Sequence, residues 1–196
     1  ATQALGNIEI DGISSDNLSS MMEKVTAGAT GALGQISMEG YSSSNLTTML
    51  SKITSGATSA LGDIEMEGYS SNNLSLMVEK ITAGATSALD EIQLEGFSSD
   101  NLSSMVQEIT SGATGALDEI EMAGFDPSTD VFSMTEKVIL GTTGALSEIE
   151  MDGYDSDDLE GMIEGVTTGA MSAINELQSA GLDQNNMSNM MKSISS

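Results

Sequence analysis

The residues best suited to chemistry in this sequence are carboxylates, and their densest group lies within the stretch "EMDGYDSDDLEG". The group comprises Glu150, Asp152, Asp155, Asp157 and Asp158. Ligand sets made only of oxygen atoms suit Ca²⁺ or Mg²⁺, so the spacing predicts a candidate calcium site. The stretch is not an EF-hand, because Val166 stands where that motif needs a bidentate Glu. The alternative is that the three aspartates cap the start of a helix and the other carboxylates are solvated.

The residue types that carry most enzyme chemistry are missing. The sequence contains no His, no Cys and no Arg. Catalysis usually needs a nucleophile beside a base, placed once in a pocket, whereas nearly every polar residue here recurs at regular intervals. Ser51 and Lys52 cannot form a dyad, because neighbouring residues of a helix point to different faces. The sequence therefore predicts a protein that is not an enzyme and has no cofactor apart from the candidate calcium ion.

The balance of charge excludes further classes of partner. The chain has 30 acidic and 5 basic residues, for a net charge of −25. This charge repels nucleic acid and anionic lipid surfaces. No apolar run approaches the ~18 residues of a membrane span. An apolar content of 39% is enough for a folded core. Frequent Ser, Thr, Gly and Asn, together with the acidity, favour a location outside the cell or on its surface.

Two series of glycines mark a repeat with a period of 28 residues. The first series is Gly12, Gly40, Gly68, Gly96, Gly124, Gly153 and Gly181, and the second is Gly28, Gly56, Gly84, Gly112, Gly141 and Gly169. Cutting after the second series divides a single repeat domain, 1–196, into units 1–28, 29–56, 57–84, 85–112, 113–141, 142–169 and 170–196. Such a period is typical of stacked repeats, in which each unit buries its apolar face against its neighbours.

Each unit carries signals for the start of a helix. A residue of a good capping type follows each glycine of the first series by two positions, namely Ser14, Ser42, Ser70, Ser98, Asp126, Asp155 and Asp183. Pro127, the only proline, occupies the favoured first helical position. Apolar residues then recur at helical spacing. We expect the glycines of the first series to end the preceding helices in a left-handed conformation.

The second glycine series decides whether each unit contains one helix or two. Four of the five lysines, Lys24, Lys52, Lys80 and Lys137, precede these glycines by four residues, where a cation would complement a helix carboxyl terminus. The sequence therefore predicts a break at the Gly28 series. The fold expected is all-α, with seven αα-hairpin repeats in a solenoid-like or up-down helical array. The alternative is a continuous helix, since an interior glycine costs only about 1 kcal/mol.

A different fold also has to be considered. The stretch "LGDIEMEGY", residues 61–69, resembles the strand segment of a leucine-rich repeat, and that resemblance implies an α/β solenoid. The Asn usual after that strand is replaced by Tyr69, Phe97 or Tyr154. Equivalent segments such as "SALDEIQLEG" consist of helix formers, so helices remain the prediction.

Two ladders of identical residues recur through the units. The methionines Met21, Met49, Met77, Met105, Met134, Met162 and Met190 could bind Cu(I), but at helical spacing they indicate adaptable core filler. The threonine pairs are Thr26 with Thr30, Thr54 with Thr58, Thr82 with Thr86 and Thr110 with Thr114. Such a row would suit an ice-binding surface if it were exposed. It also follows from capping and tight helix packing.

The fifth unit departs from the pattern by an apolar stripe. Phe132, Ile139 and Leu140 stand where other units carry small or polar residues. This stripe is either local packing over the inserted residue or a docking site for a partner.

Terminal repeats normally carry polar caps, but the first and last units here keep apolar residues. These are Leu5, Ile8, Ile10, Leu18, Met187, Met190, Met191 and Ile194. Open ends favour association of copies into filaments or rings. The sequence therefore predicts an acidic structural repeat protein that assembles with itself or is displayed on a surface. The alternative is a module that binds a divalent cation, peptide or glycan on a repetitive surface.

Overall fold

The computed structural model describes residues 13–36, 42–64, 69–92, 98–120, 127–149, 155–179 and Ser188. Within these ranges the chain is helical and has no strand. The helices are α1 (Ser15–Gly34), α2 (Ser43–Ser59), α3 (Ser71–Ser87), α4 (Ser99–Gly115), α5 (Pro127–Leu146) and α6 (Ser156–Ser179), with short 3₁₀ turns η2 (Ala88–Glu91) and η3 (Leu117–Glu119). The all-α prediction is confirmed. In the candidate strand, residues 61–64 form turns after α2 and Tyr69 is not in a strand, so the α/β alternative is wrong at these described positions.

The helices start where the capping residues predict. The backbone N–H of Asn17 donates to Ser14 Oγ at 3.3 Å. Ser42, Ser70 and Ser98 each form a capping box with an Asn three residues later. Pro127 is the first residue of α5. Asp126, Asp183 and the glycines of the first series lie outside the described residues, so the predicted left-handed helix ends stay a prediction.

The predicted break at the second glycine series is wrong. Helix α1 continues through Gly28, and the other five glycines of that series lie inside α2 to α6. Each interval of 28 residues in the described chain therefore supplies one helix, not the predicted αα-hairpin. An interior glycine disfavours a helix by about 1 kcal/mol relative to Ala. Contacts between helices must offset that cost.

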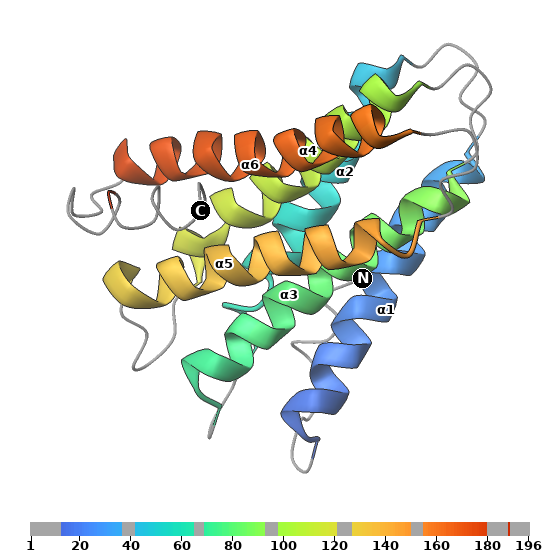
Figure 1. Cartoon of the computed structure of the whole chain (residues 1–196). Helices are drawn as coiled ribbons and strands as arrows, with labels where there is room; N and C mark the ends of the chain where they lie inside the picture. The colour runs from blue at the N-terminus through green and yellow to red at the C-terminus, as the bar shows by residue number, and fades with distance from the viewer. Residues whose placement is uncertain are drawn as a thin grey trace.

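The helices form two layers. Each helix packs mainly against the helix two places away in the chain, so α1, α3 and α5 lie side by side, as do α2, α4 and α6 (Figure 1). Consecutive helices therefore alternate between layers. Every contact inside a layer joins residues about two sequence repeats apart.

Two apolar clusters fill the space between the layers. The first joins the amino-terminal halves of α1, α3 and α5 to residues at the carboxyl ends of α2, α4 and α6, with Met77 and Leu117 among its members. The second joins the opposite halves, with Leu50, Leu89 and Met105 among its members. The helices of one layer therefore run antiparallel to the helices of the other. Met77 is 0% exposed and Met105 is 1% exposed, and Met134 and Met162 are also buried, so the interpretation of the ladder as core is confirmed at these four positions. Met21 and Met49 are only half-buried.

The paired threonines are also interior. All eight are buried. The hydroxyl of Thr82 donates within its own helix to the Val78 and Glu79 carbonyl oxygens. These threonines therefore do not form the exposed row that an ice-binding surface requires. Of the described helices, none has the length and apolar character needed to cross a membrane.

Candidate self-association surfaces

Helices of one layer approach each other closely at four glycines of the second series. A methyl group at Gly112 in α4 would lie 2.5 Å from the carbonyl oxygen of Ser51 in α2. Gly84, Gly141 and Gly169 meet the backbones of Glu23, Glu79 and Gln107 in the same way. Only a residue without Cβ allows this approach, and this explains why glycine stands inside α3, α4, α5 and α6.

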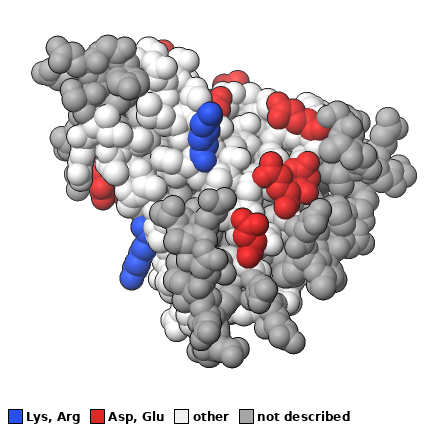
Figure 2. Space-filling view, turned by 180° about the vertical axis from the view of Figure 1, so that it is seen from behind, with Lys and Arg blue, Asp and Glu red and all other residues white. Residues whose placement is uncertain are grey.

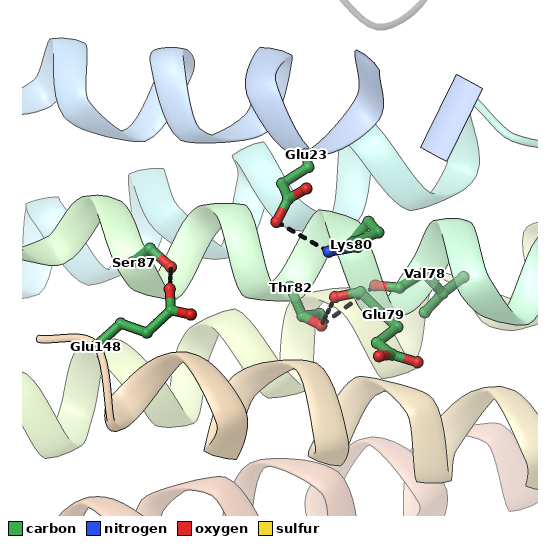
Figure 3. A network of polar contacts seen from close by, with 7 residues as sticks. All are labelled: Glu23, Val78, Glu79, Lys80, Thr82, Ser87 and Glu148. Atoms are coloured by element: carbon green, nitrogen blue, oxygen red, sulfur yellow. Dashed lines mark hydrogen bonds and ion pairs between the residues drawn. The ribbon is translucent and has the colours of Figure 1, made fainter. Parts of the chain in front are cut away.

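Ion pairs fix the register of the layer that contains α1, α3 and α5. Lys80 Nζ lies 3.3 Å from Glu23 Oε1 (Figure 3), and Lys137 Nζ lies 2.7 Å from Glu79 Oε2. Lys80 and Lys137 therefore pair with the helix two places earlier, and the predicted role at a helix carboxyl terminus is wrong because the helices continue past these positions. The paired side chains are partly exposed, so each pair contributes at most about 1 kcal/mol. Their main effect is to favour one alignment of neighbouring helices along the layer.

A hydroxyl–carboxylate pair completes the contact near the helix carboxyl ends. Ser87 Oγ donates to Glu148 Oε2 at 3.3 Å (Figure 3). In the other layer, Ser59 Oγ donates to Glu119 Oε2. Here the carboxylate comes from the later segment of the chain, from the turn after α5 or from η3 after α4, whereas the carboxylate of the lysine pair comes from the earlier helix. The two faces of each helix therefore differ, and the stacking has a direction.

The first two helices expose the face that later helices bury, and we call this surface the N-terminal edge. It consists of Met21, Lys24, Val25 and Gly28 in α1 and Met49, Lys52, Ile53 and Gly56 in α2. Among the described residues, no atom outside the glycine's own stretch of helix lies within 4 Å of a Cβ built at Gly28 or Gly56. Both lysines are exposed, and the four apolar side chains are only half-buried. Their counterparts in α3 and α4, such as Ile81 and Ile109, are 0% exposed.

Helix α6 exposes the opposite face, and we call this surface the C-terminal edge. It consists of Leu159, Glu160, Ile163 and Glu164, all of which are exposed. Ile163 is 47% exposed, whereas Leu50 and Val106, at the same position of α2 and α4, are 0% exposed. The difference arises because α2 and α4 are each followed by another helix of their layer, but α6 is not followed by a further described helix.

The candidate calcium residues that the structure describes act as a helix cap. Asp155 Oδ1 accepts hydrogen bonds from the backbone N–H groups of Asp157 at 2.9 Å and Asp158 at 3.2 Å. Asp158 Oδ2 accepts in return from the Asp155 N–H at 2.9 Å. Glu150 and Asp152 lie outside the described residues. Among those described, no cluster of three metal-binding side chains forms, and calcium binding stays a prediction.

The apolar stripe of the fifth unit belongs mostly to the interior. Phe132 is half-buried against the first apolar cluster, and Ile139 is half-buried against the second. Leu140 is 51% exposed. Local packing therefore accounts for two of the three residues, and Leu140 alone remains accessible as the candidate partner contact.

A polar depression lies between α2 and α4. Its volume is about 280 Å³, and it is lined by Ser43, Ser44, Thr47, Asn101, Ser104, Gln107 and Glu108. Glu108 is the one titratable residue among those that line it. On the face shown in Figure 2, acidic side chains are spread over several patches.

No protein-family model matches the chain, and no curated protein is significantly similar to it. The two edges are the surfaces that reading the sequence alone missed as specific sites. The signal that finds them is a comparison of the same repeat position in successive helices, once the partner of each helix is known.

Proposed function

We propose that this protein is a non-enzymatic structural scaffold, a solenoid of 28-residue units that associates end to end. The observation that carries the proposal is the N-terminal edge, where α1 and α2 expose residues whose counterparts in later helices are buried. A repeat array that remains single normally covers its ends with polar residues. Here the apolar side chains are half-buried at the N-terminal edge and exposed at the C-terminal edge.

The charge of the chain determines the conditions for assembly. A net charge of −25 makes copies repel one another, and this repulsion extends over about 10 Å at 0.1 M salt. Salt screens the repulsion, and a divalent cation bridging carboxylates would reduce it further. We therefore propose that the protein assembles outside the cell or on its surface, where ionic strength and Ca²⁺ are available to its carboxylates.

Electron microscopy and light scattering of the purified chain test the proposal. The protein would be examined over a concentration series at low salt, at physiological salt, and with added Ca²⁺. We expect particle mass to rise with concentration and salt, with filaments or rings in the images. A monomer of constant mass under all three conditions would contradict the proposed function.

A further inference from the structure

We infer that assembly is head to tail: the C-terminal edge of one copy packs on the N-terminal edge of the next, in the register found within each layer. The inference rests on the proposed function and adds a direction, a register and the contacting residues to it. The occupant of the C-terminal edge is a second copy of this chain. Three features of the described contacts support the match.

The apolar groups of the two edges are complementary. Within the chain, Leu50 of α2 packs with Met105 and Ile109 of α4 in one cluster. Ile163 stands at the position of Leu50, and Leu159 lies one turn before it. At the N-terminal edge, the positions of Met105 and Ile109 are held by Met21 and Val25 in α1. In α2 they are held by Met49 and Ile53. Each edge therefore carries the half of an apolar contact that the other lacks.

The glycines of the N-terminal edge match the backbone of α6. In both described contacts of this layer, the glycine meets the residue that stands five positions before the glycine of the partner helix: Gly112 meets Ser51, and Gly169 meets Gln107. In α6 the residue five positions before Gly169 is Glu164. The register therefore places the Glu164 backbone against Gly28 or Gly56, which have open space to receive it.

The charges of the two edges match in the same register. In the pairs Lys80–Glu23 and Lys137–Glu79, the carboxylate also stands five positions before the glycine of its helix. Glu164 holds this position in α6, and Lys24 and Lys52 hold the lysine position at the N-terminal edge. Glu160, one turn away, adds a second carboxylate. Exposed cations are scarce in a chain with 5 basic residues, and two of them lie on this edge.

Other pairings of the edges are disfavoured. Two N-terminal edges would bring lysines together, and two C-terminal edges would bring Glu160 and Glu164 of both copies together. The head-to-tail contact is heterologous, since it joins two different surfaces. Such contacts form rings when the rotation between copies closes and open filaments when it does not.

Zero-length cross-linking tests the register on the unaltered chain. A carbodiimide joins a lysine amine to a contacting carboxylate as an amide, and the Lys80–Glu23 and Lys137–Glu79 pairs serve as internal positive controls. Assemblies would be grown from equal parts of ¹⁵N-labelled and unlabelled protein, then digested and analysed by mass spectrometry. We expect mixed-isotope peptides that join Glu164 to Lys24 or Lys52. Assemblies whose mixed-isotope links all lie elsewhere would overturn the inference and leave the proposed function standing. A protein that remains monomeric would overturn both.

Charge reversal supplies a second, independent readout. Glu164→Lys should raise the concentration at which assembly begins by roughly fivefold or more. Adding Lys24→Glu and Lys52→Glu should restore assembly, because the pair is then reversed. Asp118→Lys is the matched control: it makes the same change of charge at an exposed residue outside both edges. By reducing repulsion, the control should assemble more readily. If Glu164→Lys behaves like Asp118→Lys, the inference is wrong.

Discussion

The hexapeptide "ITSGAT" occurs twice, at residues 53–58 in α2 and 109–114 in α4, and its two copies differ in environment. In α4, Ile109 and Gly112 are buried against α2. In α2, Ile53 is half-buried and Gly56 is exposed. The Ile and Gly of this peptide thus lie in an interior contact in one copy and at an open surface in the other, whereas its two threonines are buried in both. What differs is the presence of an earlier helix in the layer, so burial in this fold depends on position in the array.

The largest expected contrast concerns the methionine ladder. Met77→Ala should lower the free energy of unfolding by about 3 kcal/mol, because it removes a fully buried side chain and leaves a cavity. Met21→Ala changes the same repeat position at the N-terminal edge, where the side chain is half-buried, and should cost only about 1 kcal/mol. Urea unfolding of dilute protein measures both. Equal losses would show that the two positions are equally enclosed.

The next contrast lies within α5. Gly141→Ala should lower the free energy of unfolding by about 2 kcal/mol, because the added methyl group meets the Glu79 backbone of α3. Gly144→Ala, one turn further along, should raise it by about 1 kcal/mol, since no atom of another described segment lies within 4 Å of that position and alanine favours a helix. The sign of the change in the urea midpoint separates the two sites. If Gly141→Ala were also stabilising, the close backbone contact would not exist.

The smallest contrast concerns the lysines. Lys137→Ala removes an ion pair with Glu79 and should cost about 0.5 kcal/mol at low salt, with the loss shrinking as salt is added. Lys52→Ala, at the exposed edge, should leave the unfolding of dilute monomer nearly unchanged. Thermal melts at low and high salt measure the difference. A salt-independent loss in Lys137→Ala would show that its effect is packing and not charge.

Local signals in the sequence were sufficient to predict where the helices start and which kinds of residue form the core. Ser42, Ser70 and Ser98 cap helices because capping depends on the few residues that follow. The helical spacing of the methionines likewise identified interior positions. Both kinds of inference use interactions within one turn or one helix, which the order of residues specifies directly.

The role of the second glycine series could not be predicted from neighbouring residues. A glycine and a preceding lysine fit a helix end when one helix is considered alone. Gly84 and Lys80 instead contact Glu23, a residue about two repeats earlier in the chain. Because the 28-residue period makes every unit look alike, the sequence gives no indication that each helix packs on its second neighbour. For the same reason it did not distinguish the N-terminal edge from the interior.

The most direct test of this account is the concentration at which assembly begins in the double variant Gly28→Ala, Gly56→Ala, measured by sedimentation velocity beside the unaltered chain. The two methyl groups project into open space in the single chain, so dilute protein should be as stable or slightly more stable to urea. They would also obstruct an incoming backbone, and assembly should begin at a concentration about tenfold higher or more. An unchanged onset would contradict the claim that copies join through the contact that already holds each layer together.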